Sequence, residues 1–190
     1  DHRPFLDSEH GPIHLFKDRG VTLPEPFDDE YFRHMQWAHF AAGGAGGGMR
    51  WPNRHPHTLT AGMRSAQAAL ARFLPLIDWQ RFRRRNLNAE LRADTPNVAL
   101  FGSGDERQAV AWLLRTDSLG PDGTLRGDVD ALPVSLAIPG LHEGRYRVTT
   151  WDTACGVVVS TNAVQHTGGD ALCLALPPIA KDLAVAITNA

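Results

Sequence analysis

The stretches RPFLDSEHGP, Arg3 to Pro12, and GGAGGGMRWPN, Gly43 to Asn53, decide how the first half of this chain is interpreted. In the first, a short apolar run is followed at once by polar residues that include Glu9, and a Gly-Pro pair then breaks the strand. An apolar strand that brings a carboxylate to its carboxyl end, before a turn, is how barrel enzymes present catalytic groups. In the second, glycines lead into Met49 to Pro52, which predicts another strand with an aromatic residue, Trp51, at its exit.

Together the two stretches resemble strands seven and eight of the (β/α)8 glycoside hydrolases that act with retention, the clan of the cellulases and mannanases. PFLDSEHGP and, some forty residues later, GGMRWPN carry this likeness, which covers roughly the first eighty residues. In that clan a glutamate at the end of strand seven is the nucleophile, and a tryptophan after strand eight forms the floor of the sugar site. The resemblance therefore implies that Glu9 is the nucleophile and that Trp51 stacks on a sugar ring.

A retaining glycosidase needs a second carboxyl group, about 5–5.5 Å from the first, to protonate the leaving oxygen. In the clan this group usually lies in an Asn-Glu pair after strand four, but the chain contains no Asn-Glu dipeptide. We therefore expect a missing N-terminal portion or a second polypeptide to provide the acid/base residue and to complete the barrel. His10 would orient the nucleophile, and Arg50 and Asn53 would hydrogen-bond the hydroxyl groups of a carbohydrate substrate.

The same reasoning predicts that the chain is not a folded monomer by itself. Two strands and two helices cannot close a barrel of about 250 residues, and parallel strands are normally covered on both faces. The helices present apolar residues that need partners: Phe32, Met35, Leu70 and Phe73. Leaving such side chains in water costs roughly 1.5–3 kcal/mol each.

Two helices are predicted in the first half. Asp28 or Asp29 caps a helix that runs from Asp29 to Ala42, and Thr60 caps a second helix that stops at Pro75. His39, on the apolar face of the first helix, fits an interior hydrogen-bonded histidine better than a metal ligand. The glycines between residues 43 and 48 match neither a phosphate loop nor a dinucleotide fingerprint, and we interpret them as space for a close backbone approach inside a barrel.

From about Asn88 short apolar runs alternate with turn signals, which favours an antiparallel β-sandwich. The predicted fold class is thus α/β plus all-β: the last two βα units of a TIM barrel over residues 1–87, then an accessory sandwich over residues 88–190. Asp152 and Gly156 are predicted turn residues, and Trp151 is expected to pack inside the sandwich rather than bind sugar. The predicted strands are Val98–Phe101, Ala109–Arg115, Val134–Ile138, Arg145–Trp151, Val157–Thr161, Leu172–Leu176 and Leu183–Thr188.

Composition narrows the remaining functions. With 43% hydrophobic and 21% charged residues, a net charge of −2 and one short basic cluster at residues 81–85, nothing in the sequence favours nucleic acid or an anionic membrane as a partner. No apolar stretch is long enough to span a bilayer. His55 and His57 lack a third ligand at the usual spacing, so no metal and no cofactor is predicted. Cys155 and Cys173 form either one bridge or two buried free thiols, and the second is favoured.

Two interpretations of the first half stay open. From the residues alone, Glu9 is slightly better explained as a capped or salt-bridged glutamate at a strand end, and the resemblance shifts the balance to a nucleophile. The rival to an O-glycosyl hydrolase is a non-catalytic carbohydrate-binding or structural protein, in which the barrel part is degenerate and the sandwich binds the ligand.

Overall fold

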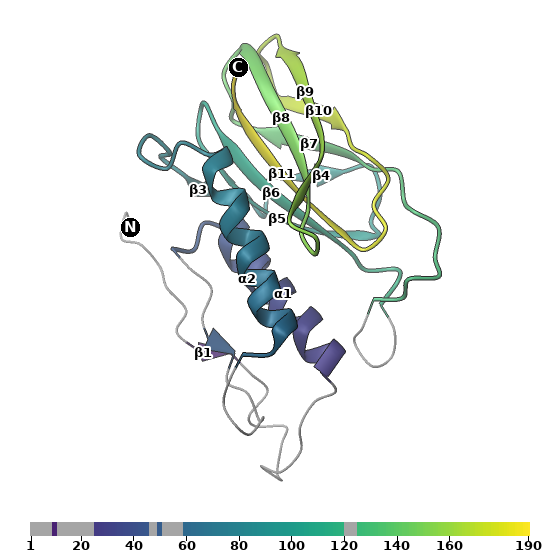
Figure 1. The fold of residues 1–190 in the computed structure, drawn as a ribbon. Coiled ribbons are helices and arrows are strands. Elements are labelled where there is room, and N and C mark those ends of the chain that lie inside the picture. The colour runs from purple at the N-terminus through teal and green to yellow at the C-terminus, as the bar shows by residue number, and fades with distance from the viewer. Residues whose placement is uncertain (1–8, 11–24, 46–48, 51–58, 120–124) are drawn as a thin grey trace.

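The computed structural model describes residues 9–10, 25–45, 49–50, 59–119 and 125–190 (Figure 1). Its first part is strand, helix, strand, helix, and its second part consists of strands joined by turns. The two helices lie on a six-stranded antiparallel sheet, and a three-stranded antiparallel sheet shares a core with the same six strands. The predicted mixture of a helical first part and a sheet-rich second part is confirmed. The barrel units and the sandwich remain interpretations.

Every strand run predicted in the second half is a strand, with ends that differ by a few residues. Two further strands, β3 and β4, were not predicted, because two residues are too few to show a period of two. The strands of the second part are β3 (Arg85–Asn86), β4 (Arg92–Ala93), β5 (Val98–Gly104), β6 (Ala109–Arg115), β7 (Ser135–Pro139), β8 (Gly144–Asp152), β9 (Val157–His166), β10 (Ala171–Ala175) and β11 (Asp182–Asn189).

The last strand of the chain lies inside the larger sheet. Strand order there is β3-β5-β6-β11-β8-β9, so β11 separates β6 from β8, and Val185 is opposite Ala111 on one side and Thr150 on the other. The smaller sheet has the order β10-β7-β4. Completing the larger sheet therefore requires the final residues of the sequence, which makes its folding strongly non-local.

Alternation along the central strands assigns their side chains to two different cores. In β6, Ala111 and Leu113 face one core whereas Val110 and Trp112 face the other, and all four are buried. Successive side chains of a strand point to opposite faces, so a strand that is apolar throughout needs cover on both. The central strands of this sheet have that cover.

We call the cluster between the two sheets the sheet core. Its residues come from both sheets and from the loops that connect them, and all are at least nine-tenths buried. They are Leu87, Leu91, Val98, Ala109, Ala111, Leu113, Val134, Leu136, Ile138, Leu141, Tyr146, Val148, Leu172, Leu174, Leu176, Ile179, Leu183, Val185 and Ile187.

We call the cluster between the helices and the larger sheet the helix core. Phe73 is fully buried at its centre, with ring centroids 5.0 Å from Trp37, 5.8 Å from Phe40 and 5.8 Å from Trp151, all edge to face. Its buried residues are Trp37, Phe40, Ala41, Phe73, Ile77, Phe82, Val110, Trp112, Trp151, Ala184 and Ala186. Trp151 is thus packed, but against the helices and not inside a sandwich as predicted.

The helix core corrects one expectation from the sequence. The apolar side chains of Phe32 and Phe73, which we expected to need partners from outside, are buried by this chain itself. Phe32 packs with Met63 and Ala66 between the helices, and Phe73 packs on the sheet. Met35 and Leu70 are only partly buried. The sheet-rich part of the chain covers one face of these helices.

Helix α1 (Glu25–Ala41) begins four residues before the predicted start. Pro26 lies in its first turn, where the missing N–H costs nothing because the first amides of a helix have no partner within it. Gly43, with φ of +98°, ends the helix: its N–H donates to the carbonyl of Phe40, and that of Gly44 donates to His39. Gly43 therefore ends a helix, whereas the sequence predicted that it lets the backbone approach closely inside a barrel.

Helix α2 (Ala61–Phe73) has the predicted cap. The Thr60 hydroxyl accepts a hydrogen bond of 3.0 Å from the N–H of Met63, and a short 3-10 helix over Leu74–Leu76, which contains Pro75, follows the last turn. The turn from β8 to β9 lies against this helix. Gly156 there has φ of +67°, and a Cβ at this position would lie 2.7 Å from the Cα of Ala69. Asp152 accepts hydrogen bonds from two N–H groups of the same turn, as its predicted role requires.

The cysteines and the basic cluster lie on the surface. Cys155 and Cys173 are free, as favoured, but both are exposed, so the prediction of buried thiols is wrong. Cys155 lies in a turn and Cys173 lies on the outer side of β10, a strand at the edge of the smaller sheet. The basic cluster is a solvated face: Arg85 pairs with Glu90, and Arg84 lies over the Trp79 ring.

Candidate functional site

The predicted nucleophile lies in the first of two short parallel strands. Glu9 and His10 form β1 (Glu9–His10), and the predicted sugar-binding Arg50 lies in β2 (Met49–Arg50). The two strands pair in parallel, with Glu9 opposite Met49 and His10 opposite Arg50. The structure therefore brings together the backbones of three of the five predicted site residues. Trp51 and Asn53 lie outside the described residues, as do His55 and His57.

The alternation of strands and helices fits the parallel direction of β1 and β2. Parallel neighbours need a crossover connection, usually a helix, and α1 lies between β1 and β2 in the sequence. Helix α2 follows β2 in the same way. Each helix therefore begins after the carboxyl end of a strand, which is the end where open α/β sheets and barrels place ligands.

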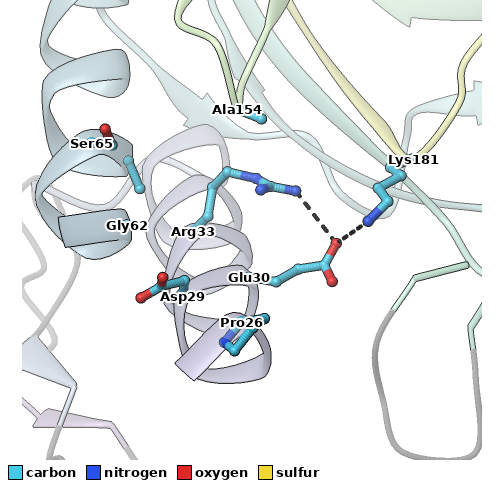
Figure 2. A pocket seen from close by; sticks show the side chains of 9 residues that line it. Pro26, Asp29, Glu30, Arg33, Gly62, Ser65, Ala154 and Lys181 are labelled. Atoms are coloured by element: carbon cyan, nitrogen blue, oxygen red, sulfur yellow. Dashed lines mark hydrogen bonds and ion pairs between the residues drawn. The ribbon is translucent and has the colours of Figure 1, made fainter. Parts of the chain in front are cut away.

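A pocket of about 320 Å³ lies near the N-terminal ends of both helices (Figure 2). Helix α1 provides one wall, α2 a second, and the turn after β8 together with the residue before β11 a third. The residues that line it are Pro26, Asp29, Glu30, Arg33, Gly62, Ser65, Ala66, Ala154 and Lys181. The sequence did not predict this pocket.

Opposite charges meet at one wall of the pocket. Figure 2 shows Glu30 and Arg33 projecting from α1 towards Lys181. The Glu30 carboxylate lies 3.2 Å from the Lys181 ammonium and 3.6 Å from the Arg33 guanidinium. The Glu30 and Arg33 side chains are only 12% and 14% exposed, so water screens this interaction weakly.

Arg33 also reaches a second carboxylate deeper in the molecule. Its Nη2 lies 3.3 Å from Oδ1 of Asp182, whose side chain is 4% exposed. The other oxygen of Asp182 accepts a hydrogen bond of 2.9 Å from the Trp112 indole and another from the Thr153 hydroxyl. Both carboxylate oxygens of Asp182 thus have partners. We call Glu30, Arg33, Lys181 and Asp182 the ionic cluster, and it ties α1 to β11 and β6.

His34 lies beside this ionic cluster, with its ring centroid 5.7 Å from that of Trp112. Burial lowers the pKa of His34 from 6.5 to about 4, against the opposing effects of the Asp182 and Glu30 carboxylates. Geometry agrees, because Nε2 lies 3.3 Å from the Arg33 guanidinium, which can only donate a hydrogen bond. His34 is therefore neutral at pH 7, with its proton on Nδ1.

The opposite wall of the pocket is held at the start of α2. Thr60 donates its hydroxyl hydrogen to the Asp29 carboxylate and accepts the N–H of Met63. A Cβ at Gly62 would overlap that carboxylate, so this position has room only for glycine unless Asp29 moves. The first turn of a helix favours a nearby negative charge, which explains the place of Asp29.

Only part of this arrangement could be recognised in the sequence. A glutamate and an arginine three residues apart on a helix, as Glu30 and Arg33 are, can be recognised as a pair from spacing alone. Asp182 is 149 residues from Arg33, and a single sequence has no periodic signal that links them. Chemically, the paired and hydrogen-bonded groups of the cluster suit the positioning of α1 better than proton transfer.

Among the described residues, no group of three or more histidine, cysteine, aspartate or glutamate side chains is placed to hold a metal ion. None of the helices described is both long and apolar enough to cross a membrane.

Similarity to known proteins is found in structure and not in sequence. No family model matches the chain, and no curated protein matches it. One similar solved structure is a glycoside hydrolase of family 5 from Bacteroides vulgatus ATCC 8482, with 9% identity and a TM-score of 0.49 over 100% of this chain and 41% of that one. Another is described as a glycoside hydrolase, with 12% identity and a TM-score of 0.45 over 99% of this chain and 43% of that one.

The chain thus spans about two fifths of the length of each of these two proteins. Likeness at this level establishes neither a shared fold nor a shared activity.

Proposed function

We propose that this chain is the C-terminal part of a retaining glycoside hydrolase that cleaves β-glycosidic bonds. In this proposal, residues 1–87 are the end of a (β/α)8 catalytic barrel, and residues 88–190 are an accessory β-sandwich. The observation that supports it most is the parallel pairing of β1 with β2 in a strand-helix-strand-helix order. Consecutive units of a barrel have this order and this pairing.

Glu9 is the proposed nucleophile. It would attack the anomeric carbon to form a glycosyl ester, and an acid would protonate the leaving oxygen, after which water would hydrolyse the ester. His10 would orient the carboxylate, Trp51 would stack on the sugar, and Arg50 and Asn53 would bind its hydroxyl groups. The register supports a shared site for His10 and Arg50, because these two residues are directly opposite in the strand pair.

The acid/base residue and the rest of the barrel would come from outside this chain. They would belong either to a preceding part of the same protein or to a separate polypeptide.

The test is the substitution Glu9→Gln in the complete protein, with any polypeptide that copurifies. Removing the attacking charge while keeping the size should lower kcat on aryl β-glucosides, β-mannosides and β-cellobiosides at least about a thousandfold, with an unchanged melting temperature. Glu143→Gln, at an exposed position of the second part, is the matched control and should keep full activity.

Retained turnover by Glu9→Gln would show that Glu9 is not the nucleophile. If the unmodified protein binds oligosaccharides but hydrolyses none of these substrates, the non-catalytic carbohydrate-binding alternative replaces the proposal.

A further inference from the structure

The free edges of the two sheets differ in length and charge. The larger sheet ends at β3 and β9, and the smaller sheet ends at β4 and β10. Strands β3 and β4 are two residues long and each contains an arginine, and β10 has five residues. Strand β9 has ten residues and none of them is charged. Of the edges in the described part of the chain, only β9 is both long and uncharged.

Strand β9 is also unusually exposed. Val157, Val158 and Val159 are 52%, 49% and 48% exposed, and they are three of the five large hydrophobic side chains exposed among the described residues. Seven of the ten residues in β9 are exposed, and they include adjacent residues, whose side chains point to opposite faces. A long apolar edge presents unpaired N–H and C=O groups, and proteins normally protect it with charges, proline or bulges.

The first residues of β9 have one such protection, an irregular pairing with β8. The pairing with β8 is irregular between Thr150 and Trp151, which leaves Val159 without an opposite residue. From Ser160 to His166 the pairing is regular, with Thr150 opposite Ser160 and Gly144 opposite His166. Seven residues therefore form a regular, uncharged edge.

We propose that β9 pairs in antiparallel orientation with β9 of a second copy of this chain. This inference does not depend on the proposed glycosidase function. Pairing centred on Thr161 places Thr161 opposite Thr161 of the second copy and Ser160 opposite Asn162, and it brings Val158 near Val164. No like charges meet in this register, which favours self-pairing because like charges directly opposite destabilise a sheet.

A second copy fits this edge better than a different partner. Recognition of a charged peptide would need complementary charges along the strand, and β9 has none. Identical antiparallel strands are related by a two-fold axis, so the contact closes at two copies and does not grow into a fibre.

The experiment counts copies in the purified protein, with any copurifying polypeptide, by native mass spectrometry and sedimentation equilibrium in reducing buffer. Reductant is needed because Cys155 and Cys173 are exposed and can otherwise link two copies. We expect two copies per particle. Thr161→Lys and Val158→Lys, both at exposed positions, should each raise the dissociation constant of the dimer about tenfold or more.

Ala175→Lys is the matched control, because it adds the same charge at an exposed position of the shorter edge strand β10 and should leave the dimer intact. Melting temperatures confirm that all three variants are folded. One copy per particle, or a dimer that weakens equally in the control, would overturn the proposal. So would a dimer that is found only without reductant.

Discussion

The strand pair β1–β2 and the strand pair β6–β11 are stabilised in different ways. Among the described residues, β1 and β2 pair in parallel at two positions, whereas β6 and β11 pair in antiparallel at six. The longer pair is covered on one side by the sheet core and on the other by the helix core. This chain therefore stabilises its sheet-rich part with its own residues, while we expect the strands with the proposed site to depend on neighbours from elsewhere.

The largest effect should follow from damage to the helix core. Phe73→Ala removes a fully buried ring that contacts three other aromatic side chains, and it should lower the free energy of unfolding by about 3–5 kcal/mol. Chemical denaturation measures this. Leu74→Ala, at the next position and 39% exposed, is the control and should cost less than about 1 kcal/mol. Equal losses in the two variants would show that the helices do not depend on the sheet.

The second largest loss in the free energy of unfolding should follow from damage to the ionic cluster. Asp182→Ala leaves the Trp112 indole, the Thr153 hydroxyl and the Arg33 guanidinium without their shared acceptor, which should cost about 2–3 kcal/mol. Denaturation of Asp182→Ala and Asp182→Asn compares loss of the whole acceptor with loss of its charge. If both variants keep wild-type stability, the cluster does not hold α1 on the sheet.

A smaller effect is expected from acid. The unfolded chain binds a proton at His34 near pH 6.5, and the folded chain binds it near pH 4, so between these values the unfolded state holds more protons. The free energy of unfolding should therefore fall as the pH falls from about 6.5 to 4, by at most about 3 kcal/mol from this residue, with little contribution above that window. His34→Gln should remove this part of the slope, and an unchanged slope would contradict the assignment.

The same contrast between the two regions explains what could be predicted from the sequence. The strands of the sheet-rich part are long enough to show their period, and Thr60 has the type and position of a helix cap, so these elements were found. The place of β11 between β6 and β8 was not predictable, because it depends on contacts between residues far apart in the chain. The helices show apolar faces in the sequence, but an apolar face does not specify its partner, and Phe73 packs on Trp151.

Less of the candidate site than of the sheets could be predicted from the sequence. The two short stretches predicted as strands do pair in parallel, and their place in a barrel remains a prediction. Burial was predicted wrongly for Cys155 and Cys173, since a cysteine in a turn or on an edge strand carries no local signal of its exposure. The roles of Glu9, His10, Arg50, Trp51 and Asn53 remain predictions.

The central claim is that Glu9 forms a covalent bond with a sugar, and labelling tests it most directly. The complete protein would be incubated with activated 2-deoxy-2-fluoro β-glycosides, whose glycosyl esters hydrolyse slowly, and then digested for peptide mass spectrometry. We predict one fluoroglycosyl group on the side chain of Glu9 and none in Glu9→Gln. A label on a different carboxylate, or no label in a preparation that hydrolyses the matching ordinary glycoside, would contradict the account.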